Sequence, residues 1–297
     1  MNQTPSKSFQ SLTVVLAILS LALPFNASGA LPSAGEMDLR DESLREYRQD
    51  FTIKYFSDVI QLAPTNAAAH FARAAAYCRK EDYSNAIVDM NEGIRLQPMF
   101  APGYLARASA HLLNNNPNKA IPDLDEVVRL DPSSSKAYRY RARIHRDAGR
   151  LDEALTDYNE ALKHDPKDAP ALQGRATVFY FKDNFNKALV DINNALRINP
   201  GMSEAYALRG TILFETQKLE DAGSDLDKAI ALDPKSARAY GIRSQVLFKR
   251  RDYENAVSDG TQAILLNPKN PRLYLNRGNY YQVTGDSSKA IDRKSVV

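Results

Sequence analysis

Arginine and aspartate recur in this sequence at a spacing that could place opposite charges next to one another. Arg141 and Asp157 show the pattern, because each has counterparts 34 residues away along the chain. A guanidinium binds a carboxylate through two parallel hydrogen bonds, so these arginines either hold an acidic ligand or pair with aspartates inside the fold. The near one-for-one match with aspartates favours an internal ladder. The predicted members are Arg73, Asp89, Arg107, Asp123, Arg141, Asp157, Arg175, Asp191, Arg209, Asp225, Arg243, Asp259 and Arg277.

Residues able to do catalysis are sparse. The sequence has no His-Glu-x-x-His spacing, no glycine-rich phosphate loop and no serine in a nucleophile elbow. The single cysteine, Cys78, excludes an intramolecular disulfide framework and is expected to be a small helical packing residue rather than a reactive thiol. We therefore expect no enzyme activity, no metal and no cofactor. The four histidines fall at packing positions of the repeat: His70, His111, His145 and His164.

The charge of the chain gives no case for nucleic acid. The formal net charge is +3, and Lys7 and the stretch 292–294 each carry one net positive charge. Without those segments the net charge falls to +1. A nearly neutral chain lacks the basic surface that phosphate binding needs.

The 34-residue period governs the rest of the sequence. An alanine and a proline recur in step with the arginine, as Ala154 and Pro166 do in the stretch 135–168. Periods of this length are typical of stacked-repeat proteins. Apolar residues at helical spacing on both sides of Gly149 predict two antiparallel helices of about 13 residues in each unit. Pro122 falls beyond the first turn of its helix, so we expect it to kink or delay that helix.

These features resemble the tetratricopeptide repeat (TPR) family. The family pattern places aromatic, small, aromatic, glycine, alanine, alanine and proline residues where this unit has Tyr138, Ala142, His145, Gly149, Ala154, Ala161 and Pro166. The resemblance covers residues 66 to 291. It implies an all-α, right-handed superhelical solenoid of antiparallel helix pairs. The arginine column departs from the family pattern, which usually has an apolar residue there.

Hairpin geometry supports the ladder. Arg141 and Asp157 are equidistant from Gly149, so they should lie level across one helix pair. Asp157 and Arg175 are equidistant from Pro166, so they should lie level across the next crossing.

The resemblance implies that the first helix of each unit lines a concave groove. Two sets of residues on these helices are candidates for partner binding: Arg139, Arg143 and Arg146 on one helix, and the aligned aromatics Tyr180, Phe214 and Phe248. They could bind a peptide that is apolar in one part and acidic in another. The alternative is that the aromatics are inter-repeat core and the arginines a solvated face. Family members that bind the C-terminal carboxylates of chaperones use a Lys/Asn pattern on this face. The corresponding places here hold Arg139, Arg143 and Gly174, so we do not expect this protein to bind chaperone C-termini in that way.

The two ends of the chain differ from the repeats. Lys7 and the apolar run 12–23, followed by small residues, are typical of a secretory signal cleaved after Ala30; an uncleaved membrane anchor is the alternative. At the other end the aspartate column falls on Arg293, and residues 292–297 match what one frame of a sequencing adapter encodes. We therefore expect a non-native tail and a native chain that continues.

The predicted organisation follows from these observations. Residues 1–30 are a signal peptide, 31–66 a degenerate N-terminal repeat or cap, and 292–297 a non-native tail. The repeats between them span 67–100, 101–134, 135–168, 169–202, 203–236, 237–270 and a truncated 271–291.

The predicted function is an exported scaffold, periplasmic or extracellular, that binds a partner protein or peptide in its groove. A membrane would be involved only through an uncleaved signal segment. Two alternatives stay open: the recognition arm of a larger enzyme truncated at its C-terminus, and a chaperone-like protein that holds unfolded chains.

Overall fold

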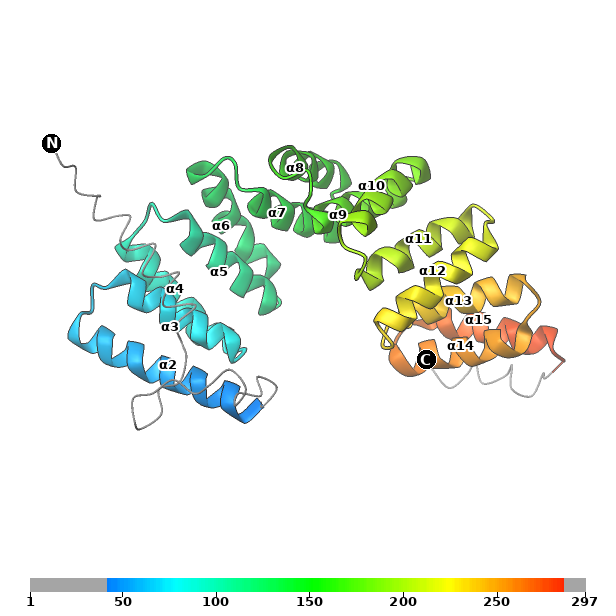
Figure 1. Ribbon diagram of the computed structural model, residues 1–297, viewed down its shortest axis with the longest axis horizontal. Helices are drawn as coiled ribbons and strands as arrows, with labels where there is room; N and C mark the ends of the chain where they lie inside the picture. The colour runs from blue at the N-terminus through cyan, green and yellow to red at the C-terminus, as the bar shows by residue number, and fades with distance from the viewer. Residues whose placement is uncertain (1–41, 286–297) are drawn as a thin grey trace. The chain divides into compact units, whose positions relative to one another are not determined.

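The computed structural model describes residues 42–285. The expected signal segment, the first part of the N-terminal cap and the tail at 292–297 therefore lie outside the described residues. All regular structure between residues 42 and 285 is α-helical, and paired helices run antiparallel (Figure 1). The expected all-α fold of antiparallel helix pairs is confirmed.

We call the first helix of each pair the A helix and the second the B helix. The A helices have 13 residues each: α3 (Ala67–Arg79), α5 (Ala101–Leu113), α7 (Ser135–Asp147), α9 (Ala169–Phe181), α11 (Ser203–Glu215), α13 (Ala237–Lys249) and α15 (Pro271–Val283). The B helices have 14 residues each: α4 (Tyr83–Leu96), α6 (Pro117–Leu130), α8 (Leu151–His164), α10 (Phe185–Ile198), α12 (Leu219–Leu232) and α14 (Tyr253–Leu266). The longer α2 (Glu42–Leu62) precedes them.

Local sequence sets where these helices begin and end. Asp82 and Asp168 cap the starts of α4 and α9, because their side chains accept a hydrogen bond from an amide three residues on. Each B helix ends two residues before a proline of the repeating series. The residue between them is extended at Asp165 and Asn199, as the following proline ring requires.

Small side chains allow the helices to cross closely. The repeating alanine at the start of each B helix is fully buried, as Ala154 and Ala188 are. Gly174 shows the tightest approach: a Cβ added there would overlap the ring of the buried Tyr158. Close packing at such sites leaves no room for a larger residue.

The chain divides into two compact units at the boundary between Ile144 and His145. In the first unit, residues 42–144, one apolar cluster centres on Leu124 and Val127 and another on Met90. In the second unit, residues 145–285, the largest cluster contains Leu208 and Leu226.

One sequence prediction differs in part from the structure. Pro122 does not delay its helix, since α6 begins at Pro117 and is as long as the other B helices. The other half of the expectation, a kink, stays a prediction. Pro122 is exposed, so the carbonyl that loses its partner can bond to water.

The six turns between paired A and B helices, and the turn that follows α15, each contain a residue with positive φ. Glycine occupies this place only at Gly149 (φ 76°) and Gly285 (φ 78°). The other five turns place a non-glycine residue in the left-handed conformation: Glu81, Asn115, Asp183, Gln217 and Arg251.

Within residues 42–285, every helix falls short of the length and apolar content needed to span a bilayer.

Candidate functional site

The repeating arginines lie between the helices and bind buried aspartates. In each of five pairs, arginine Nε and Nη2 donate to the two carboxylate oxygens of an aspartate 16 residues later, at 2.5–2.9 Å. The aspartates are 3–7% exposed. The five pairs are Arg73–Asp89, Arg107–Asp123, Arg175–Asp191, Arg209–Asp225 and Arg243–Asp259.

The remaining nitrogen of each arginine reaches back to the preceding repeat. Arg107 Nη1 donates to Asn91 Oδ1 at 2.7 Å, so the bond across the repeat boundary comes from a residue two positions after Asp89. The sequence pattern instead assigned that bond to Asp89. Successive repeats are rotated about the stacking axis, so a different residue of the B helix faces the next arginine. The corresponding acceptors elsewhere are Ser57, Asp125, Asn159, Asn193, Asp227 and Thr261.

Two ladder positions flank the boundary between the units, and each is described within its own unit. Arg141 Nη1 donates to Asp125 Oδ1 at 2.6 Å in the first unit. In the second unit, Asp157 Oδ2 lies 3.7 Å from His145 Nε2. At the far end, Arg277 Nη1 donates to Thr261 Oγ1 at 3.3 Å.

These bonds neutralise the arginines of the five pairs. The hydrogen bonds to aspartate raise the pKa of the Arg73, Arg107, Arg209 and Arg243 guanidinium groups, against the opposing effect of burial. The ring centroid of Tyr104, three residues before Arg107, lies 5.7 Å from the Arg107 guanidinium. Arg209 and Arg243 each have a tyrosine at the equivalent position, also three residues earlier. With their donors and their charge already matched, the five paired arginines are poorly suited to hold a ligand.

The three arginines proposed for partner binding on α7 have different surroundings. Arg139 and Arg143, in the first unit, lie 5.1 and 5.8 Å from the ring centroid of Tyr140. Arg146, in the second unit, donates to Asp147 Oδ1 from Nε and Nη2 at 2.9 and 2.7 Å. The charge of Arg146 is therefore partly neutralised by its own neighbour in the chain.

The three aligned aromatics are half-buried and shared between the core and the surface. Tyr180 and Phe214 pack against the same apolar cluster of the second unit. Phe248 stacks on Tyr280, with ring centroids 4.8 Å apart, and also contacts Tyr253. Their rings contribute to packing between repeats while part of each remains accessible.

The polar residues next to these aromatics use their donors within their own helices. Thr177 and Thr211 hydroxyls donate to the carbonyls of Gln173 and Ala207 at 2.9 and 2.7 Å. Gln245 Nε2 donates to a carbonyl one turn earlier at 3.1 Å. The partly exposed Thr177 hydroxyl oxygen can still accept a hydrogen bond, for instance from a peptide N–H, whereas Thr211 is buried.

The A helices of the second unit form one continuous surface. α9, α11, α13 and α15 contact one another in series, and no contact of comparable extent joins the B helices α10, α12 and α14 in this part of the chain. The A helices therefore lie on the inner side of the bend within this unit. We call this surface the A-helix face, and its solvent-facing residues include Thr177, Tyr180, Phe181, Glu204, Phe214, Glu215, Arg238, Gln245, Phe248 and Arg272.

Sequence reasoning missed the arginines at the start of α13 and α15. Arg238 and Arg272 occupy the second position of their A helices, where Glu204 stands in α11. Arg238 is exposed to solvent, yet burial by surrounding protein lowers its pKa. The Arg238 side chain is therefore accessible to solvent and at the same time partly desolvated by neighbouring residues. The signal in the sequence was the run of charged residues in this column, which the search for aromatic and polar columns did not include.

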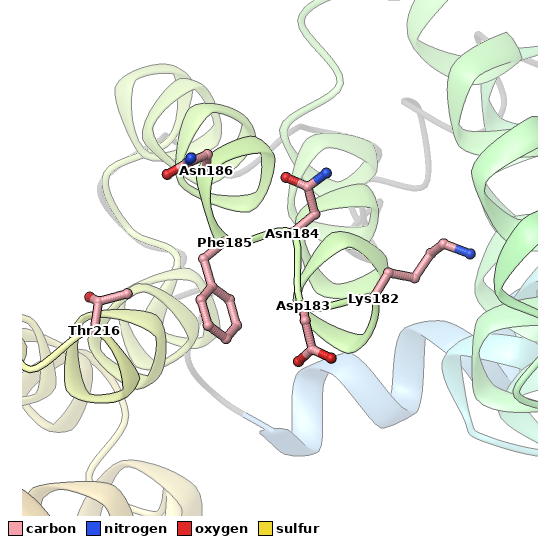
Figure 2. Close-up of a pocket in the computed structure, with 6 residues that line it drawn as sticks. All are labelled: Lys182, Asp183, Asn184, Phe185, Asn186 and Thr216. Carbon is pink, nitrogen blue, oxygen red and sulfur yellow. The ribbon is translucent and has the colours of Figure 1, made fainter.

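A shallow depression of about 350 Å³ adjoins the A-helix face (Figure 2). Its walls are the turn from Lys182 to Asn186 and, on the neighbouring repeat, Thr216. Phe185 in this turn packs against Tyr180, with ring centroids 6.0 Å apart. Lys182 Nζ donates a hydrogen bond to Asp152 Oδ1 at 2.8 Å. The depression is thus an extension of the Tyr180 end of the face.

The described residues offer nothing that would hold a metal ion, since no group of three His, Cys, Asp or Glu side chains comes together between residues 42 and 285.

Comparison with known proteins places these observations in a family. The tetratricopeptide repeat model matches residues 105–169, 174–237 and 208–271, which together make up more than half of the chain. A comparison with curated proteins gave no match.

Three similar solved structures share the fold at low identity. The APC/C hetero-tetramer Cut9–Hcn1 aligns over 93% of this chain and 53% of its own, with a TM-score of 0.71 and 15% identity. The chain thus spans about half the length of that relative. Pseudomonas aeruginosa pilF aligns over 79% and 98%, with a TM-score of 0.61 and 16% identity. A tetratricopeptide repeat protein from Parabacteroides merdae aligns over 77% and 93%, with a TM-score of 0.61 and 16% identity.

The family match covers the arginine–aspartate ladder from Arg107 to Asp259 and most of α9, α11 and α13 of the A-helix face. The chain therefore belongs to the tetratricopeptide repeat family.

Proposed function

We propose that this protein is an interaction scaffold that binds an extended segment of a partner protein on the A-helix face of residues 145–285. The observation that carries the proposal is the joining of α9, α11, α13 and α15 into one surface on which aromatic and polar side chains remain accessible. Accessible aromatic area supplies apolar contact, and polar groups beside it can bond a peptide backbone.

The exposed Phe181 makes this proposal testable without disturbing the core. It is 56% exposed at the end of α9, where its ring lies 5.7 Å from that of Tyr180. Val190 on the B helix α10 is 62% exposed and offers a matched control away from the face. Neither side chain is buried, so replacing either with serine should leave the fold intact.

The experiment selects peptides from a phage-displayed library on the full chain and then measures binding of the strongest peptide by fluorescence anisotropy. Covering half of the Phe181 side chain is worth about 1 kcal/mol, so Phe181→Ser should weaken binding about fivefold. Val190→Ser should leave binding unchanged. Equal effects of the two substitutions, or failure to select any peptide, would refute binding at this face.

The arginines on α7 remain a second proposed contact for an acidic part of a partner. Replacing Arg139 and Arg143 with glutamate should weaken capture of the partner if they contact it. Recovery equal to that of the parent chain would remove them from the site.

We also propose that the protein acts outside the cytoplasm, on the basis of residues 1–30 alone. N-terminal sequencing of the protein from its native source should give a chain that starts at Leu31. A mature chain that starts at Met1 would argue against cleavage.

A further inference from the structure

Arg238 makes few polar interactions within its own protein. Its Nη2 donates to Thr211 Oγ1 at 3.4 Å, which is its only side-chain hydrogen bond within residues 42–285, and it has no ion pair there. The ladder arginines differ sharply, because each of those five pairs has two bonds to one carboxylate at 2.5–2.9 Å. Arg238 therefore has guanidinium donors available for a ligand.

Side chains from two other A helices lie near this arginine. Thr211 comes from α11 and Tyr180 from α9, two repeats earlier. Tyr180 is close enough to interact electrostatically with both Arg238 on α13 and Arg272 on α15. Burial raises the pKa of the Tyr180 hydroxyl, which therefore stays protonated at neutral pH and can donate a hydrogen bond.

The nearby acidic groups do not occupy the guanidinium. Glu204 attracts Arg238 electrostatically, but its Oε2 accepts from Gln173 Nε2 at 3.0 Å and forms no ion pair with Arg238 in the described chain. Glu215 and Asp183 interact with Tyr180 from the opposite ends of their repeats, where the A helices finish. Arg238 and Arg272 thus lie at the starts of their helices, where Glu204 also lies, whereas Glu215 and Asp183 lie where the A helices end.

We propose that Arg238, supported by Arg272, Thr211 and Tyr180, binds the carboxylate of an aspartate or glutamate side chain in the bound partner segment. A guanidinium that is already partly desolvated forms charge-assisted bonds that are stronger than those of a fully solvated one. The proposal rests on peptide binding at the A-helix face, and it adds the chemistry that the partner must carry.

The test is a double-mutant cycle that combines a substitution in the protein with a substitution in a selected peptide. The peptides chosen on the full chain should share an acidic residue. Changing that residue from Glu to Gln in an amidated, fluorescein-labelled peptide should weaken binding to the parent chain about tenfold, as expected for loss of a charged hydrogen bond. With Arg238→Gln the same change in the peptide should matter less than twofold.

Controls separate this site from general attraction and from unfolding. Arg197→Gln removes an exposed arginine on the B helix α10 and should leave the tenfold effect in place. Arg238→Lys keeps the charge without the fork, so its affinity should be intermediate. A melting temperature equal to that of the parent shows that each variant is folded.

The alternative outcomes are distinct. A peptide that binds and depends on Phe181, but not on its acidic residue, would leave the proposed function standing and overturn the role of Arg238. Loss of binding on C-terminal amidation would assign the site to a terminal carboxylate and overturn the side-chain assignment. If no peptide binds, both proposals fail.

Discussion

The Arg175–Asp191 pair allows the strongest test of what the internal ladder does. Arg175 Nε and Nη2 bind the two Asp191 oxygens at 2.7 and 2.8 Å, and Nη1 binds Asn159 at 2.8 Å. The Arg175 side chain is 23% exposed and that of Asp191 is 5% exposed. Arg175→Leu would leave a buried carboxylate without its cation, which should cost about 3 kcal/mol.

The two other variants should be milder. Asp191→Leu leaves an arginine that can turn to solvent, so we expect a loss of about 2 kcal/mol. The double variant buries two apolar side chains and no charge, so it should also lose only about 2 kcal/mol rather than the sum of about 5 kcal/mol. The expected coupling is therefore about 3 kcal/mol.

Urea denaturation followed by circular dichroism on the full chain gives the four free energies, provided that the slope is unchanged among the variants. The exposed pair Lys163–Glu160 on α8 is the control, with side chains 68% and 36% exposed. The coupling energy from a double-mutant cycle on this pair should be less than about 0.5 kcal/mol. Additive losses at Arg175 and Asp191, within about 0.5 kcal/mol, would refute a coupled buried pair.

Three further variants test other features of the fold. Gly174→Ala forces a Cβ into the ring of Tyr158 and should lower the free energy of unfolding by about 2 kcal/mol. Adding Tyr158→Leu should recover part of that stability in the same urea assay. Gln217→Gly relieves a left-handed backbone (φ 61°) and should raise the free energy of unfolding by about 1 kcal/mol; no gain would show that the turn is unstrained. Burial lowers the pKa of His111 below its ordinary 6.5, so the neutral form stabilises the fold above that pH and this contribution is lost as the pH falls below it. His111→Phe should therefore lose less stability than the parent between pH 7 and pH 5, by at most about 1.4 kcal/mol per pH unit, and identical pH profiles would contradict this.

The sequence by itself determined the repeating unit, because each helix pair is a local structure. Helix starts and ends follow from capping residues and prolines within a few positions, and the fully buried alanines mark where paired helices cross. The aspartate that binds each repeating arginine lies in the same pair of helices, as at Arg107 and Asp123. Its place is fixed by hairpin geometry that the spacing of 16 residues already contains.

The structure decided features that depend on more than one repeat. The rotation between repeats gave Asn91, rather than Asp89, the bond to Arg107 across the boundary. The turn conformation is also invisible in the residue types, because Gln217 and Arg251 adopt the same positive φ as Gly149. The helix pair imposes that backbone whether or not the sequence supplies glycine.

The surroundings of Arg238 depend most clearly on the tertiary structure. Tyr180 and Arg238 are 58 residues apart in the sequence, and nothing in either repeat alone brings them together. Only the bend of α9, α11 and α13 toward one another places a tyrosine near an arginine two repeats later. Local patterns define each helix pair, but the curvature that builds a binding surface accumulates from contacts between successive pairs.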